Sequence, residues 1–306
     1  MRNIFIINPC AGQGKNFGRL QEDIQKASEK TCMPTELYYT KCVGDAEQFA
    51  RSIVQTGEEV NLFACGGDGT MNEIVNGVYG YPNAYVGVVP IGTGNDFVRN
   101  FGKASTFMNI EKQLLGEPQK VDLIEYKTGD KTRLCANMIN IGFDCNVVIK
   151  TAEMKKKPLV SGSGAYLLSV LETLIKKKGA NLKVTVDGTV VHNGPNLLCA
   201  IANGSYCGGG VYSSPQAKTD DGYMDVNVIL NMSRTKFIKL FPSYKKGTHF
   251  EVEGIEKMVH AFPAKETKIE SLCGPMGLCC DGEIETVEEV SFKIIDKCLD
   301  FIVPKK

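Results

Sequence analysis

The sequence has no net charge, little histidine and no long apolar run. Lysine and arginine together number 35, as do aspartate and glutamate, so the formal net charge is 0 at pH 7. A protein that binds nucleic acid usually carries a basic domain, so nucleic acid is not expected as the main partner. No apolar stretch approaches the length of a membrane span, and no signal peptide precedes the first strand-like segment. These absences predict a cytoplasmic protein without a transmembrane segment.

Motifs that bind metal through cysteine and histidine are also missing. The twelve cysteines are scattered without a CxxC pair and only three histidines accompany them, so a zinc site is not expected. Many of the cysteines lie within apolar runs, where a thiol behaves as a small hydrophobic group and where a reduced cytosol is the simplest context. The length of 306 residues suggests two domains of ordinary size.

The sequence does contain a glycine-rich stretch, GGDGTMNE, at residues 66–73. It follows an apolar run at residues 60–65 and precedes a helical pattern at residues 72–79, so it lies where a strand turns into a helix. Glycines let the backbone approach a ligand closely, and free amides at a helix N-terminus attract phosphate. The carboxylate of Asp68 would repel phosphate unless a divalent cation lies between them. The alternative is a glycine turn with an aspartate N-cap.

A second glycine stretch, IGTGNDF, follows the apolar run at residues 86–90. Strands and helices alternate over residues 1–126, which predicts a parallel doubly wound sheet. Two glycine loops after consecutive strands of such a sheet form one crevice at its carboxyl edge, where ligands bind. The loop at residues 8–15 is not a P-loop, because Pro9 occupies the position of the first glycine.

The stretches GGDGTMNEIVNG and PIGTGNDF resemble the diacylglycerol kinase catalytic domain, which bacterial lipid kinases and sphingosine kinases share. The resemblance implies ATP as the phosphoryl donor, Mg²⁺ as its partner, and a first domain like that of NAD kinases and phosphofructokinases. It also implies a metal nearby for Asp122, an acidic residue within an apolar strand. The nucleotide site that it implies consists of Asn8, Pro9, Gly12, Thr40, Gly66, Gly67, Asp68, Gly69, Thr70, Asn72, Glu73, Gly92, Thr93, Gly94 and Asn95.

The pattern changes near residue 127, where strands separated by turn signals begin. Residues 182–186 and 189–192, joined by Asp187-Gly188, predict a β-hairpin. We interpret residues 127–291 as an antiparallel β-sandwich domain interrupted by one helix at residues 165–178. The first domain is expected to comprise residues 1–126, with the C-terminal segment 292–306 packing back on it.

Two motifs of this second half extend the resemblance. Around Gly222 the family holds Mg²⁺, which implies Lys218, Asp221 and Tyr223 as ligands, the first and third through backbone oxygens. The family also has a catalytic DGE motif, which implies roles for Asp281 and Glu283. On an extended chain the two carboxylates would share one face. The alternative is a surface hairpin turn, which Asp-Gly often marks.

The expected function is ATP-dependent transfer of a phosphoryl group to a lipid hydroxyl, with Asp68, Asp281 and Glu283 as catalytic residues. Diacylglycerol is the first candidate acceptor, and sphingoid bases, ceramide and phosphatidylglycerol remain open. The alternatives are a soluble-substrate kinase related to NAD kinases and a non-catalytic regulator that binds nucleotide or lipid. The enzyme is expected to meet the membrane transiently, at its inner, cytosolic surface, and a homodimer remains open. Three lysine clusters could meet anionic headgroups: residues 155–157, 176–178 and 245–246.

Overall fold

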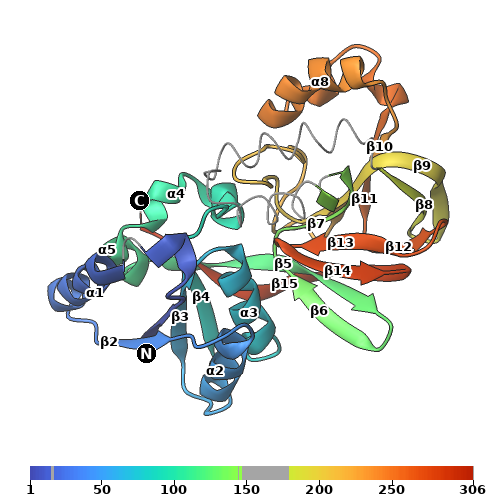
Figure 1. The fold of residues 1–306 in the computed structure, drawn as a ribbon. Coiled ribbons are helices and arrows are strands. Elements are labelled where there is room, and N and C mark those ends of the chain that lie inside the picture. The colour runs from blue at the N-terminus through green and yellow to red at the C-terminus, as the bar shows by residue number, and fades with distance from the viewer. Residues whose placement is uncertain (15–16, 144, 147–178, 306) are drawn as a thin grey trace. The chain divides into compact units, whose positions relative to one another are not determined.

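The computed structural model describes residues 1–14, 17–143, 145–146 and 179–305. The chain divides by its contacts into two compact units, whose segments can be followed by colour in Figure 1. The first unit contains Met1–Leu123, Thr219–Asp221 and Ile295–Lys306, and the second contains Ile124–Lys218 and Gly222–Ile294. Inclusion of residues 219–221 in the first unit was not expected from the sequence. The helix expected at residues 165–178 and the lysine clusters 155–157 and 176–178 lie outside the described residues.

The first unit is built on a parallel sheet. Its inner strands are mostly apolar and buried, as in β1, because helices cover both faces of a parallel sheet. The order of neighbours is β15-β4-β3-β1-β2, and every pair in this series is parallel. The strands are β1 (Arg2–Ile7), β2 (Thr35–Tyr39), β3 (Val60–Gly66), β4 (Ala84–Pro90) and the end of β15 (Glu289–Val303).

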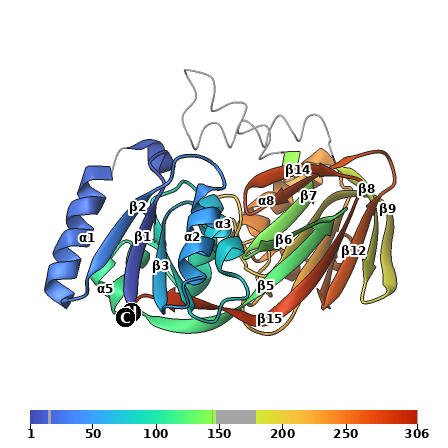
Figure 2. The same cartoon turned by 90° about the horizontal axis from the view of Figure 1, so that it is seen from below.

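Helices pack on both faces of this sheet, so the predicted doubly wound arrangement is confirmed (Figure 2). On one face, Phe5 of β1 packs with Leu20 of α1 and Leu114 of α5. Side chains alternate along a strand, so the buried neighbours Ile4 and Ile6 point to the other face. The helices are α1 (Phe17–Thr31), α2 (Asp45–Val54), α3 (Asp68–Val78), α4 (Ala104–Phe107) and α5 (Ile110–Leu114), with 3-10 turns η1 (Ala11–Gly14) and η2 (Phe97–Phe101).

The C-terminal strand completes the first sheet. Asp300 and Phe301 of β15 pair with Tyr85 and Val86 of β4, and β5 (Glu117–Thr128) pairs with β15 in turn. The ring of Phe301 packs edge-on against Phe97, with ring centroids 5.0 Å apart. The last strand of the chain is therefore an inner strand of the N-terminal sheet.

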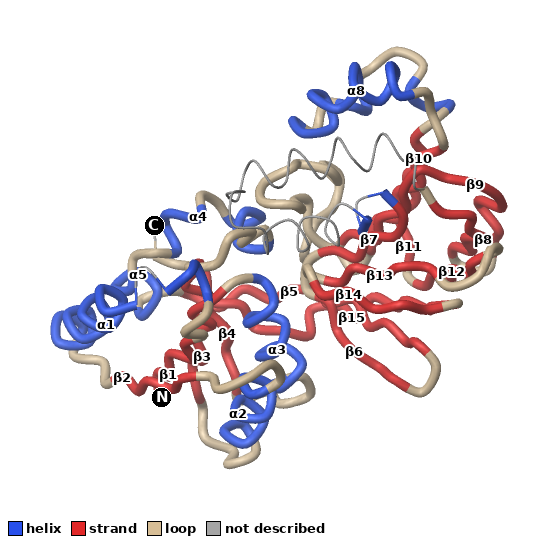
Figure 3. Tube along the Cα trace, in the orientation of Figure 1, coloured by secondary structure: helices blue, strands red, loops and turns tan. Residues whose placement is uncertain are grey.

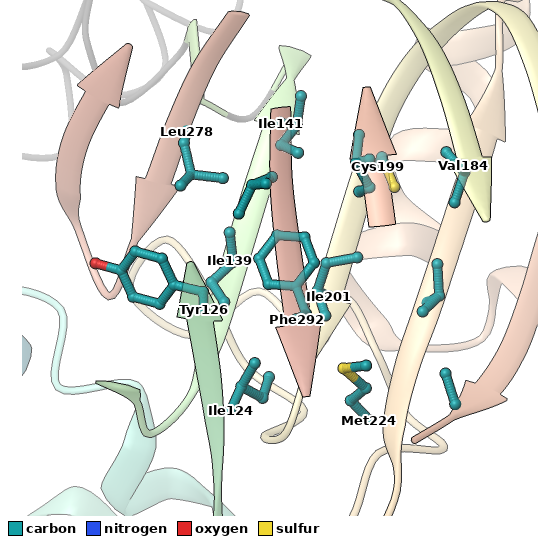
Figure 4. Packing of buried hydrophobic residues seen from close by; sticks show 14 of the residues in the cluster. Ile124, Tyr126, Ile139, Ile141, Val184, Cys199, Ile201, Met224, Leu278 and Phe292 are labelled. Atoms are coloured by element: carbon teal, nitrogen blue, oxygen red, sulfur yellow. The ribbon is translucent and has the colours of Figure 1, made fainter. Parts of the chain in front are cut away.

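The second unit is made mainly of antiparallel strands around its own core. Side chains from different strands, such as Ile139, Ile201 and Phe292, point toward one another in this core (Figure 4). The hairpin predicted at Asp187-Gly188 is confirmed, with φ of 45° and 81° at the two turn residues. The strands are β6 (Lys131–Cys135), β7 (Met138–Gly142), β8 (Ala180–Val186), β9 (Thr189–Ala202), β10 (Met224–Leu230), β11 (Val259–Ala264), β12 (Glu266–Ser271), β13 (Met276–Cys280) and β14 (Glu283–Val287).

A helix not expected from the sequence, α8 (Arg234–Lys246), joins β10 to β11 (Figure 3). The hydroxyl of Ser233 accepts a hydrogen bond from the Lys236 amide at its start, and Gly247 ends it in the left-handed conformation. The 3-10 turns η3 (His249–Glu251) and η4 (Ile255–Lys257) follow. None of the described helices is long and apolar enough to cross a membrane.

Candidate active site

The two glycine stretches meet backbone to backbone at the carboxyl ends of β3 and β4. The amide of Gly92 donates a 2.9 Å hydrogen bond to the carbonyl oxygen of Gly66. A Cβ at Gly92 would collide with the Cα and amide nitrogen of Gly67, so this close approach requires glycine. The structure thus brings together two segments that the sequence placed at neighbouring strand ends.

The helix after the first stretch begins earlier than predicted. It begins at Asp68, with Gly67 as its N-cap, and not at residue 72. Residues 68–71 of the motif are therefore the first turn of α3, at the carboxyl edge of the sheet. Such a turn attracts anions through its free N–H groups and the positive end of the helix dipole. This geometry suits the phosphates of a nucleotide.

Asp68 links the two glycine stretches through its carboxylate. Its Oδ1 accepts hydrogen bonds from the backbone amides of Asp96, at 2.8 Å, and Phe97, at 3.3 Å. A Cβ at Gly94 would lie 2.7 Å from Asp68 Oδ2, so glycine leaves room for the carboxylate there. Asn95 adopts φ of 54°, and its side-chain amide donates to the carbonyl oxygens of Pro90 and Gly92.

The loop after β1 reaches the same edge. The side-chain amide of Asn8 donates a 3.3 Å hydrogen bond to the hydroxyl of Thr70 in the first turn of α3. Gly12 has φ of 58°, and a Cβ there would lie 2.5 Å from the Ile91 carbonyl oxygen. Thr40 follows β2, and its backbone amide donates a 2.9 Å hydrogen bond to the carbonyl oxygen of Ile7. Of the remaining predicted nucleotide ligands, Pro9 and Thr93 are exposed on these loops.

Glu73 and Asn72 make contacts within the α2–α3 region. The two carboxylate oxygens of Glu73 accept hydrogen bonds from the amides of Gly44, at 2.9 Å, and Ala46, at 3.1 Å. They therefore stabilise the N-terminus of α2, which has no side-chain cap of its own. The buried side chain of Asn72 accepts a 3.2 Å hydrogen bond from Asn76. For both residues a direct role toward the nucleotide stays a prediction.

Asp122 is fully buried and holds two distant segments on the first unit. Its Oδ1 accepts a 2.7 Å hydrogen bond from the amide of Lys297, which adopts φ of 46° in β15. Its own amide donates a 2.7 Å hydrogen bond to the carbonyl oxygen of Thr219. The segment that carries Asp221 is thereby fixed to the unit that carries Asp68. The signal in the sequence was an acidic residue in an apolar run, which needs a partner.

The DGE motif forms a hairpin turn, so the extended geometry expected for it was wrong. Asp281 and Gly282 have φ of 45° and 93° and connect β13 to β14. The Asp281 carboxylate accepts hydrogen bonds from the amides of residues 136, 137 and 138, at 2.9–3.2 Å, and from the Cys135 thiol at 3.2 Å. Glu283 is exposed at the start of β14.

Cys135, Cys280 and Asp281 form a group of close ligand atoms within 4.8 Å of one another. Burial raises the pKa of both thiols. Mg²⁺ prefers oxygen ligands, so two protonated thiols do not suit it. In the part of the chain that the structure describes, neither Asp68 nor Asp221 belongs to a comparable group of three such side chains.

The three residues predicted to hold Mg²⁺ in the second half lie close in sequence, and each is exposed. The grouping of contacts assigns Asp221 to the first unit, and Lys218 and Tyr223 to the second. The ammonium group of Lys265 lies 5.4 Å from the centre of the Tyr223 ring. Their role as metal ligands stays a prediction.

The first unit is thus a parallel sheet with glycine-lined loops at its carboxyl edge, and the second unit is mainly antiparallel β structure. Residues 2–126 match the diacylglycerol kinase catalytic domain. Residues 137–303 match the YegS C-terminal NAD kinase beta sandwich-like domain. The chain belongs to the family that combines these two domains, and it is a kinase. The family predicted from the two glycine motifs is confirmed.

Relatives along nearly the whole chain carry the name diacylglycerol kinase. One from Staphylococcus epidermidis is 28% identical over 302 residues, which cover 98% of this chain and 91% of that protein. One from Staphylococcus aureus is 29% identical over 301 residues, with the same coverage. The crystal structure of a diacylglycerol kinase from Bacillus anthracis str. Sterne is similar with a TM-score of 0.71 at 21% identity, covering 98% of this chain and 96% of that one. At that identity the likeness shows the fold alone.

Proposed function

We propose that this kinase transfers the γ-phosphoryl group of ATP to the hydroxyl of a membrane lipid, and that diacylglycerol is the acceptor and phosphatidic acid the product. The observation that carries the proposal is the Asp68 carboxylate, which joins two glycine loops at the carboxyl edge of a parallel sheet. The names of the relatives at 28–29% identity support the choice of diacylglycerol.

The first unit binds the nucleotide. The first turn of α3 offers its positive dipole end to the phosphates, at the sheet edge where the two glycine loops meet. Asp68 and Asp221 offer carboxylate oxygens, which are the ligands that Mg²⁺ prefers. When bound, the ion would neutralise charge on the phosphates during transfer.

The second unit supplies the acceptor for the hydroxyl proton. As the lipid oxygen bonds to the γ-phosphorus and ADP leaves, the hydroxyl proton must pass to a base. The Asp281 oxygens already accept hydrogen bonds from three backbone amides and one thiol. We therefore assign the proton to the exposed Glu283, and to Asp281 the positioning of the turn that carries it.

An acceptor panel tests this function. The purified protein is incubated with γ-labelled ATP, Mg²⁺ and one acceptor at a time: diacylglycerol, a sphingoid base, ceramide, phosphatidylglycerol or NAD. Labelled phosphatidic acid, identified by mass spectrometry, is the expected product. Label in NADP with none in any lipid would instead identify a soluble-substrate kinase.

A further inference from the structure

Helix α8 has two faces of opposite character. Phe237, Leu240 and Tyr244 are buried and pack on a core that includes Leu198 and Ala200 of β9. On a helical projection the opposite face carries Lys239, Lys246 and Pro242, flanked by Ile238 and Lys245. All five of these residues are exposed, Ile238 by 58%. One face therefore holds the helix on its unit, and the other meets water.

The outward face is positively charged, and α8 itself contributes no acidic residue to balance it. The sequence RTKFIKLFPSYKK of α8 contains no aspartate or glutamate. Among the described residues, Lys236, Lys239, Lys245 and Lys246 have no ion-pair partner within 4.0 Å. Lysines elsewhere are commonly paired, as Lys26 is with Glu22 and Lys30 with Glu111. The next acidic residues in the sequence lie beyond the end of the helix: Glu251, Glu253 and Glu256.

We propose that this face of α8, with Lys236, Ile238, Lys239, Pro242, Lys245 and Lys246, docks on the anionic surface of a phospholipid bilayer. A basic amphipathic helix binds such a surface through its lysines and through apolar side chains that enter the headgroup region. Ile238 is an exposed apolar side chain on this face, one helical turn before Pro242 and two turns before Lys245. A second copy of the chain is a poor occupant, since the unpaired lysines of two copies would face each other.

The docking proposal rests on the proposed function in one point only, namely that the acceptor lipid lies in a membrane. Docking through α8 would hold the second unit at the bilayer while a lipid is taken up. Docking through α8 needs no residue of the glycine loops and no residue of the DGE motif. Binding to vesicles can therefore be measured without ATP and apart from phosphoryl transfer.

The test compares sedimentation with vesicles of phosphatidylcholine containing one-third phosphatidylglycerol and vesicles of phosphatidylcholine alone. The full-length protein should bind the anionic vesicles more tightly, and salt should weaken this binding. Each lysine near the surface is worth about fivefold in affinity, so Lys239→Gln with Lys246→Gln should weaken binding about 25-fold. Ile238→Gln should weaken the part of the binding that survives high salt. The matched control is Lys26→Gln with Lys30→Gln, which changes the net charge equally on α1.

Four outcomes would refute docking of α8 on the bilayer. Two come from the vesicle assay: unchanged binding by the α8 variants, or an equal loss of binding by the α1 control. The other two point to a different partner: tighter α8-dependent binding to duplex DNA than to vesicles, or a dimer in ultracentrifugation that Ile238→Gln dissociates. The thermal transition should match that of the wild type in all variants, because the substituted side chains are exposed. The two proposals fail separately. Vesicle binding through α8 without phosphorylation of any lipid would refute the kinase substrate alone. Phosphorylation of diacylglycerol in vesicles, unaffected by the α8 variants, would refute the surface alone.

Discussion

The carboxylate of Asp68 accepts a 2.8 Å hydrogen bond from the backbone amide of Asp96, which lies 28 residues further along the chain. One acidic side chain thus fixes the spacing of the two glycine loops. The same side chain is predicted to act on the ATP phosphates through a cation. Its structural and chemical contributions can be separated, because an amide oxygen can accept the same hydrogen bond without the charge.

Asp68→Asn should retain the fold and lose turnover. The asparagine oxygen can still accept from Asp96 and Phe97, so the thermal transition should move little. Loss of the charge should remove several kcal/mol of metal-dependent stabilisation and lower kcat by roughly 10²-fold or more. Asp68→Ala, which loses both functions, should also lower the thermal transition. Near-native turnover of Asp68→Asn in a radiolabel assay would refute the proposed role of the charge.

Gly92→Ala should separate the glycine loops. The added methyl group would collide with the Cα of Gly67, and backbone cannot move as cheaply as a side chain. We expect weaker binding of ATP, measured by calorimetry, together with a lower thermal transition. The control is Gly18→Ala in α1, where a Cβ has no neighbour within 4 Å. Equal ATP affinity of both variants would contradict a nucleotide site at this contact.

Asp281→Asn and Glu283→Gln should behave differently. Asparagine has one acceptor oxygen, while both oxygens of Asp281 accept backbone N–H groups, so Asp281→Asn should destabilise the protein by about 1–3 kcal/mol. Glu283 is exposed, and Glu283→Gln should leave the thermal transition unchanged. Its turnover should fall about 10²- to 10⁴-fold, as expected for loss of a general base, with ATP affinity retained. Full turnover of Glu283→Gln would mean that the hydroxyl proton goes elsewhere.

His249 should make stability dependent on pH below neutrality. Its ring is buried beside Tyr244 and Phe250, and this burial lowers the pKa of His249 from its usual 6.5 to about 4. The unfolded chain therefore binds a proton more readily than the folded one as the pH falls from about 6.5 toward 4. The unfolding free energy should decrease by about 2 kcal/mol between about pH 7 and pH 5 from this group. Urea denaturation at both pH values checks this, and His249→Phe should remove that share of the decrease.

Much of the first unit could be predicted because two of its inner strands, β3 and β4, are mostly apolar runs that lead into glycine stretches. The apolar runs at residues 60–65 and 86–90 lie within strands β3 and β4 of the structure. The start of α3 was placed too late because the glycines of GGDG suggest a loop, whereas here Asp68 and Gly69 already belong to the first helical turn. Helix α8 was missed since Pro242 interrupts its pattern. These errors arise where local propensity and the packed structure disagree.

The least predictable features of the site depend on contacts between distant segments. Nothing near residue 219 indicates that its carbonyl oxygen pairs with the amide of Asp122. The four hydrogen bonds to Asp281 come from a turn about 145 residues earlier in the chain. The residue types of the motifs could be read from the sequence, but their partners required the fold.

The position of β15 has a consequence for synthesis on the ribosome. Domains commonly fold from the N-terminus as the chain emerges, but here β4 remains an open edge until residues 300 and 301 arrive to pair with it. Until then the apolar ring of Phe97 lacks its partner Phe301, and an unpaired parallel edge is exposed to other nascent chains. The first unit to be translated is thus the last to be finished, because its sheet is complete only when residues 300 and 301 pair with β4, and not when residue 126 appears.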